Sequence, residues 1–252
     1  MRNILKFIGV DLAWGLKRPS ALCIIHKDDN GFFYETVLHL FGLEDFMSFF
    51  HTHQEETLVL AIDAPLTVKN REGNRRPERE ISIFLRRFRG GILPVNLTIV
   101  EQKYPRLALF WQLLCQNHFQ ITSTILDSFW RIAFEVFPPL IVLGLWGKET
   151  LETYWQEKKS RQRFPLFQQR IAELTTSFSP PLQGLERFFS ALQDSSFFID
   201  ACDALLCAYA ACFLWARGRR CARVFGTAQE GEVVMPVQEA QRDLVNFASS
   251  RA

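Results

Sequence analysis

The chain carries almost no excess charge of either sign. Among its 252 residues, 29 Lys and Arg oppose 27 Asp and Glu, giving a formal net charge of +2. A general polyanion-coating protein is therefore excluded, and any nucleic-acid surface has to be local. Internal repeats, low-complexity segments and a clear linker are also absent. Because 48% of the residues are hydrophobic and 24 are Phe, disorder is excluded, and we expect a single domain over residues 1–252.

The sequence has no Cys-x-x-Cys pair, so a structural zinc site of the common type is not expected. Five of the six cysteines lie in apolar runs, which favours reduced, buried thiols over a disulfide framework. This pattern is typical of a cytoplasmic protein, and we expect that location. The cysteines are Cys23, Cys115, Cys202, Cys207, Cys212 and Cys221.

No apolar run of membrane-spanning length is free of charge. The longest run, residues 196–216, contains Asp200 and Asp203, and two carboxylates near the middle of a lipid span are costly. We therefore expect a buried helix and no membrane partner. The apolar run within residues 1–14 contains Asp11 and is followed by no small-residue cleavage site, so a signal peptide is not expected.

What the sequence does contain is hydrophobic periodicity typical of one mixed α/β sheet. Three β-rich runs around the turn signal at residues 28–31 predict an antiparallel meander. The continuous apolar run at residues 57–62 predicts a strand covered on both faces, which Pro65 stops. Strands are expected at 5–11, 21–26, 32–40, 57–62, 131–137, 221–225 and 232–235; helices are expected at 44–53, 78–88, 104–119, 164–176, 181–193 and 198–217, with a helical insertion around 140–195.

Acidic residues recur at the carboxyl ends of the predicted strands, where sites gather in open α/β sheets. Asp11, Asp63 and Glu135 each lie at or near such an end, and they would repel one another unless a cation lay between them. Asp203, on one face of the last long helix, could join them as a fourth carboxylate. Hard divalent cations prefer oxygen ligands, so the pattern favours a Mg²⁺ or Mn²⁺ site.

Each acid also has a simpler interpretation. Asp11 and Asp63 could organise turns, and Glu135 could pair with an Arg. Asp200 could be a first-turn acid favoured by the helix dipole, an explanation that suits it better than Asp203. The recurrence of acids on three strands is what favours the metal site.

Several motifs, taken together, resemble the domain-of-unknown-function family numbered 429, which is described as a predicted nuclease with a ribonuclease H-like fold. The resemblance implies a five-stranded mixed sheet of order 3-2-1-4-5, flanking helices and a short C-terminal strand pair. It also implies that Asp11, Asp63 and Asp203 are the acids of that fold and that Glu135 belongs to an E-x-x-P element. The motifs are GVDLAWG (9–15), AIDAPL (61–66), NREGNRRPERE (70–80), GGILPVN (90–96), FEVFP (134–138), YWQEKKS (154–160), DACDALLCAYAA (200–211) and EGEVVMP (230–236).

Two basic segments are candidates for contacts with a phosphodiester. Residues 69–89 follow Asp63 and hold eight Lys and Arg against three Glu, and forked donors on Arg75 and Arg79 suit a phosphate clamp. The alternative is a solvated helix face whose charges the glutamates Glu72, Glu78 and Glu80 partly neutralise.

The second basic segment contains Lys158 and Lys159, which could line the same groove or simply be solvated. Trp14 could stack on a base or a sugar, although packing against a neighbouring helix is the default expectation. We found no His in the position of a catalytic base, so water activation would depend on the metals.

Three functions fit these features. The leading hypothesis is a metal-dependent nuclease or phosphodiesterase in which Asp11, Asp63, Glu135 and Asp203 hold Mg²⁺ or Mn²⁺ and act on a nucleic acid or nucleotide. The second is a ribonuclease H-like module that binds nucleic acid or protein and cuts nothing. The third is an actin-like nucleotide phosphotransferase, because GVDLAWG faintly resembles a first phosphate loop.

Overall fold

Alternating apolar residues near the N-terminus build the centre of the sheet. The computed structural model describes residues 4–125, 130–160, 165–192 and 197–243. Strands β1, β2 and β3 form the antiparallel meander that was predicted, and β4 adds to β1 in parallel. These strands are β1 (Leu5–Asp11), β2 (Ser20–Asp28), β3 (Gly31–Leu40) and β4 (Thr57–Ile62).

The sheet extends beyond these strands at both edges. Within the described residues it has nine strands in the order β7-β3-β2-β1-β4-β6-β9-β8, with β5 pairing beside β6. The prediction of a mixed α/β sheet is confirmed, but the sheet is larger than the five strands expected, because the C-terminal pair β8–β9 joins it through β6. The remaining strands are β5 (Gln120–Ile121), β6 (Arg131–Val136), β7 (Leu182–Gln183), β8 (Ala222–Thr227) and β9 (Gly231–Pro236).

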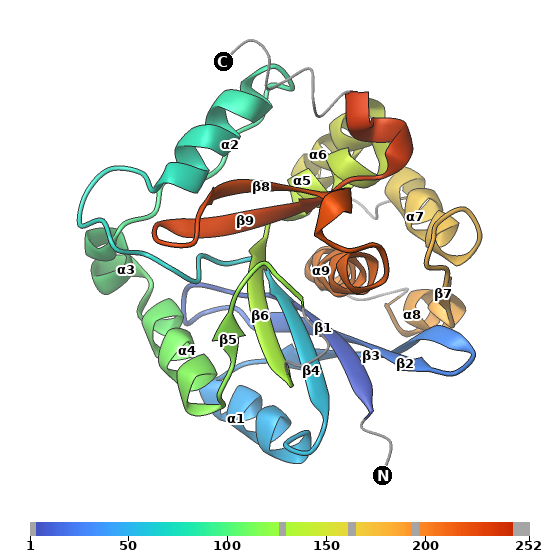
Figure 1. Ribbon diagram of the computed structural model, residues 1–252, viewed down its shortest axis with the longest axis horizontal. Coiled ribbons are helices and arrows are strands. Elements are labelled where there is room, and N and C mark those ends of the chain that lie inside the picture. The colour runs from blue at the N-terminus through green and yellow to red at the C-terminus, as the bar shows by residue number, and fades with distance from the viewer. Residues whose placement is uncertain (1–3, 126–129, 161–164, 193–196, 244–252) are drawn as a thin grey trace.

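Helices cover both faces of the sheet, as Figure 1 shows. On one face, the long helix α9 packs on β1, β2 and β4, and α5 to α8 complete the same core. On the opposite face, α1, α3 and α4 enclose a second core. Helix α2 lies against β8. The helices are α1 (Leu43–Thr52), α2 (Arg76–Arg86), α3 (Leu97–Lys103), α4 (Pro105–Gln116), α5 (Pro138–Trp146), α6 (Lys148–Ser160), α7 (Pro165–Ala172), α8 (Leu185–Leu192) and α9 (Phe198–Arg217).

Helix α9 approaches the centre of the sheet very closely, and small residues make this possible. A Cβ added at Gly9 of β1 would lie 1.9 Å from the Ala204 carbonyl oxygen and 2.2 Å from the Ala208 nitrogen. The predicted close approach is therefore real. By length and composition α9 is also the one helix in the described residues that could cross a membrane, but most of it is buried inside the fold.

Three helices, α3, α5 and α6, were not assigned individually in the sequence. Pro138 was interpreted only as the end of a strand, yet it begins α5, because Pro is favoured in the first turn of a helix. Asn96 caps α3 by accepting a hydrogen bond from the Ile99 N–H at 2.9 Å, a recognisable start signal. Five of the six cysteines are buried thiols as predicted, whereas Cys115 is exposed.

Candidate carboxylate site

Asp11 and Asp63 lie side by side at the carboxyl ends of two parallel strands. Val10 is in register with Ile62, and the Asp63 N–H donates to the Val10 carbonyl at 2.8 Å. Each Asp is one residue beyond this pair. Because neighbouring strands are about 4.8 Å apart and successive side chains alternate between faces, both carboxylates lie on the face covered by α9.

Glu135 belongs to the opposite face of the sheet. It is in register with Ile62 of β4, whose side chain lies in the second core away from α9. Its backbone position at a strand end was predicted, but the direction of its side chain was not. Glu135 therefore comes to the strand ends from the other side of the sheet to the two aspartates.

The strand ends open into a cavity of about 410 Å³. Asp11, Asp63 and Glu135 line it together with Trp14, while most of the remaining wall is apolar. Trp14 also packs edge-on against Tyr104, with ring centroids 5.0 Å apart. The default expectation for Trp14, packing against a neighbouring segment, is thus met, and the same ring still forms part of the cavity wall.

The two aspartates are strongly disfavoured as anions. Burial is the main cause that raises the pKa of Asp63 to about 8 and the pKa of Asp11 well above its usual range. The negative charge of Asp203 raises both pKa values further, and the charge of Lys158 opposes this effect. The repulsion between two such carboxylates is relieved when they share a proton or bind a cation.

Asp203 has its own positive partner. Its Oδ2 accepts a hydrogen bond from Lys158 Nζ at 2.6 Å, and its Oδ1 accepts one from the Tyr154 hydroxyl at 2.9 Å. Lys158 Nζ also donates to the Tyr154 hydroxyl at 2.9 Å. The carboxylate is buried, whereas the Lys158 side chain is 42% exposed. Lys158 was predicted to contact substrate; in the structure its first partner is Asp203.

Glu135 is neutralised by Arg75. Arg75 donates to Oε1 at 2.6 Å and to Oε2 at 3.0 Å, and the Leu66 N–H donates to Oε2 at 3.1 Å. Arg75 Nε donates as well to both carboxylate oxygens of Glu78, at 2.9 and 3.0 Å. Arg75 is therefore a buried bridge between two glutamates, not the open phosphate clamp that was predicted. The alternative stated for Glu135, pairing with an Arg, is the arrangement present.

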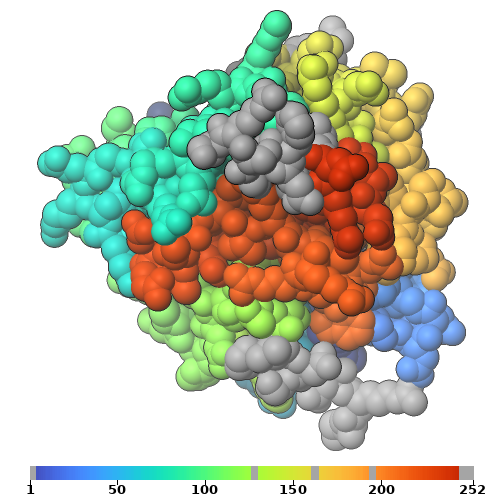
Figure 2. Space-filling model, turned by 45° about the horizontal axis from the view of Figure 1, so that its top comes forward, coloured from blue at the N-terminus to red at the C-terminus, as the bar shows by residue number. Residues whose placement is uncertain are grey.

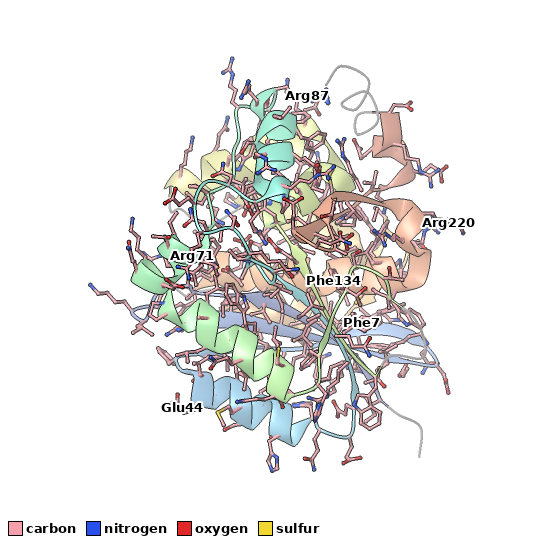
Figure 3. The ribbon with its side chains drawn as sticks, turned by 60° about the vertical axis from the view of Figure 1, so that its left-hand side comes forward. Phe7, Glu44, Arg71, Arg87, Phe134 and Arg220 are labelled. Carbon is pink, nitrogen blue, oxygen red and sulfur yellow. The ribbon has the colours of Figure 1, made fainter. Side chains whose placement is uncertain are left out.

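The other predicted binding residues lie away from the cavity wall. Arg79 is exposed and donates to the Asn74 carbonyl at 2.6 Å, and Lys159 is exposed on α6. In Figure 3, Arg71 and Arg87, near the two ends of the basic segment, lie far apart at the periphery of the molecule.

Sequence reasoning gave no role to Tyr154 or His39, and it named Glu78 only as one of three glutamates that could neutralise the basic segment. Glu78 and Tyr154 were detectable as helical neighbours of Arg75 and Lys158, at spacings of three and four residues. His39 was not, because it reaches the row of Asp11 only through strand pairing with Ala21. Its Nε2 is buried and has no hydrogen-bond partner among the described residues.

Within the described part of the chain, no group of three or more His, Cys, Asp or Glu side chains is placed to hold a metal ion. What remains is a pair. Asp11 and Asp63 face the cavity, and neither is hydrogen-bonded or ion-paired to a cationic side chain in that part of the chain. A pair suffices for Mg²⁺, which keeps several waters and is commonly bound by one or two carboxylates plus substrate phosphate.

Comparison with known proteins gives one positive result. No curated protein and no solved structure matches the chain. Residues 9–230 match the family described as Protein of unknown function (DUF429), a span that contains all four predicted acids. The resemblance noted in the sequence is thereby confirmed over most of the molecule: the chain belongs to the DUF429 family.

Proposed function

We propose that the protein is a divalent-cation-dependent hydrolase of phosphodiesters whose ion is held by Asp11 and Asp63. The observation that carries the proposal is the open carboxylate pair. Two aspartates in register face one cavity, and burial and mutual repulsion disfavour their charged forms. A divalent cation would relieve this repulsion and leave coordination positions for water and a phosphate oxygen.

The residues around Asp11 and Asp63 also support the proposal. When bound, the ion would supply Lewis-acid polarisation of the phosphate and a bound water of lowered pKa. Asp11 and Asp63 would orient it from rigid strand ends. The positive charge of Lys158, fixed by Asp203 and Tyr154, already lowers the pKa values of both aspartates and so favours their ionised, ligating forms.

The strand path β3-β2-β1-β4-β6 within the larger sheet supports a ribonuclease H-like interpretation of the fold. In that interpretation Asp11 and Asp63 lie on the first and fourth strands and Asp203 on the C-terminal helix, as the family resemblance implies. The proposal differs from the sequence hypothesis in one respect. Glu135 holds the Arg75 bridge and supports the loop that follows Asp63, but it is not a ligand.

Substitution of the pair tests the proposal. Asp11→Asn and Asp63→Asn should lower Mg²⁺- or Mn²⁺-dependent hydrolysis of bis(p-nitrophenyl) phosphate by about 100-fold or more while leaving the fold intact. Asp28→Asn is the matched control. Asp28 also ends a strand. Because β2 runs antiparallel to β1, Asp28 lies near the beginning of β1, at the other end of the strands from Asp11. Unchanged hydrolysis in both site variants would contradict the assignment.

A non-catalytic binding module is the second candidate, and a specific observation favours it. Two of the four predicted acids, Asp203 and Glu135, already have cationic partners, so the site has fewer free ligands than the nuclease hypothesis assumed. Isothermal titration of the wild-type protein separates the two candidates. Absence of Mg²⁺ and Mn²⁺ binding at millimolar concentration would favour the binding module and reject the hydrolase.

A further inference from the structure

The cavity above the two aspartates has an unusual composition for a polynucleotide site. Its wall is predominantly apolar, with Trp14, Leu93 and Phe137 contributing large side chains. Leu93 is 65% exposed and therefore lies where the cavity meets solvent. A mostly apolar wall with a few polar groups at one end is typical of pockets that bind small molecules.

The basic residue of the cavity wall is not available to a polynucleotide backbone. Arg75 is the one basic residue among the described residues that line the cavity, and it is buried between Glu78 and Glu135. Non-specific binding of nucleic acid depends on several free Lys and Arg near successive phosphates. The cavity wall provides none, so it does not suit an extended strand.

Two basic residues of the neighbouring segment, Arg76 and Arg87, are also engaged. Arg76 on α2 pairs with Glu80 at 2.7 Å, and the Arg87 guanidinium lies over the rings of Phe84 and Phe88, 5.5 and 5.4 Å from their centroids. Figure 2 shows the α2 segment and β8–β9 side by side on one face of the molecule, in agreement with their contacts. These cations stabilise that packing and do not converge on the aspartates.

The volume of the cavity also favours a small ligand over a polynucleotide. A volume of about 410 Å³ lies at the low end of small-molecule pockets, which span roughly 300–1,000 Å³. Such a pocket holds one nucleotide-sized group. The polar atoms are at the strand ends, while the apolar side chains of Leu12, Trp14, Leu93 and Phe137 line the rest, so a ligand with one charged end and one apolar end matches both parts.

We infer that the substrate is a small phosphate ester bearing an aromatic or other apolar group, of the size of a single nucleotide, and not a polynucleotide. The inference rests on the proposed function for the position of the phosphate, which would meet the ion held by Asp11 and Asp63. The apolar group would lie against Trp14 and Leu93. Specificity then comes from buried apolar area, with little contribution from basic side chains.

Matched esters test this substrate class. Methyl p-nitrophenyl phosphate and phenyl p-nitrophenyl phosphate release the same leaving group and differ only in the second substituent. With Mn²⁺ present, kcat/KM for the phenyl ester should exceed that for the methyl ester by about tenfold, because burial of one aromatic ring is worth at least this factor. A single-stranded oligonucleotide should be hydrolysed more slowly than the phenyl ester.

Two variants locate the effect. Leu93→Ala should lower kcat/KM for the phenyl ester and so reduce the phenyl-to-methyl ratio by roughly threefold to tenfold. Ile83→Ala is the control, because Ile83 is 59% exposed on α2 and lies outside the cavity wall. It should change neither rate. Both side chains are exposed, so neither variant should fail to fold.

The outcomes separate the inference from the proposed function. Metal-dependent hydrolysis with equal rates for the two esters, or with a preference for the oligonucleotide, would overturn the inference and leave the function standing. If no ester is hydrolysed, the proposed function fails, and calorimetry with phenyl phosphate against inorganic phosphate still tests the cavity. At least about tenfold tighter binding of phenyl phosphate supports the inference; equal affinity overturns it.

Discussion

Asp63 and Glu135 lie at the ends of neighbouring parallel strands and at nearly the same level, yet only Glu135 has a cationic partner in the part of the chain that the structure describes. Glu135 receives two hydrogen bonds from Arg75 and one from a backbone N–H. Asp63, like Asp11 beside it, has no cationic hydrogen-bond partner within the described residues, and its pKa is raised to about 8. The same contrast holds between Asp11 and Asp203, which has Lys158.

The difference separates carboxylates that support the fold from carboxylates left for a ligand. A buried charge is tolerated when it is paired and hydrogen-bonded, as Glu135 and Asp203 are. Two buried carboxylates without cationic partners in the described part of the chain, such as Asp11 and Asp63, lower the stability of the fold. Such a cost is commonly found at functional sites. The comparison therefore predicts opposite results when members of the two groups are neutralised.

The largest loss of stability is expected when paired carboxylates lose their cation. Arg75→Met should lower the free energy of unfolding by about 3–5 kcal/mol, because it leaves the buried carboxylates of Glu78 and Glu135 without their shared cation. Chemical denaturation measures the loss. Arg76→Met is the matched control on the same helix: the Arg76–Glu80 pair is partly exposed, so its removal should leave the free energy of unfolding nearly unchanged. Equal effects of the two variants would break the comparison.

Much of this contrast follows from strand alternation, which the sequence displays. In residues 131–136, Phe134 and Val136 are apolar and point to the α9 face, so period-two alternation alone assigns Glu135 to the other face. Position at a strand end was correctly predicted for all three strand acids. The direction of each side chain was not considered, and Glu135 reaches the shared cavity from the opposite face of the sheet to Asp11 and Asp63.

Other parts of the site depend on tertiary packing that local patterns do not specify. Asp11 and Asp63 become neighbours through the parallel pairing of β1 with β4, which the apolar runs favour. The contact of Lys158 with Asp203 joins residues 45 positions apart and follows from how α6 packs near α9. The sequence analysis assigned Lys158 to substrate because a charge pattern shows that a cation is present, but not which acid it meets.

A smaller effect is expected when Asp203 loses its cation. Lys158→Met should lower the free energy of unfolding by about 1–2 kcal/mol, less than Arg75→Met, because the Lys158 side chain is 42% exposed and water screens part of the interaction. Lys159→Met is the control, one residue along α6 and exposed. It should be neutral.

The Lys158 substitution also affects the open pair. Lys158 lowers the pKa values of Asp11 and Asp63, so without it both should hold protons to higher pH. The pH at which Mg²⁺ binding reaches half its maximum, measured by calorimetry, should therefore increase in Lys158→Met and not in Lys159→Met. An unchanged binding profile would show that the two groups of carboxylates are not coupled.

An effect of opposite sign, a gain in stability, is expected when one member of the open pair Asp11 and Asp63 is neutralised. A carboxyl whose pKa is raised on folding binds its proton more tightly in the folded state. Its contribution to stability is present below the unfolded pKa, near 4, and is lost as the pH rises toward about 8. Asp63→Asn removes this loss, so the variant should be more stable than the wild type at pH 8 by at least about 1 kcal/mol, or at least roughly 2–4 °C in Tm.

Thermal unfolding at several pH values, without divalent ions, measures this gain. The Tm difference between Asp63→Asn and the wild type should be near zero at pH 4, where the wild-type carboxyl is protonated, and should grow toward pH 8. Adding Mg²⁺ at pH 8 should then raise the wild-type Tm and leave that of the variant unchanged, because the ion relieves a repulsion that the variant no longer has. A variant less stable than the wild type at pH 8 would mean that Asp63, like Glu135, supports the fold, and the distinction between the two groups would be lost.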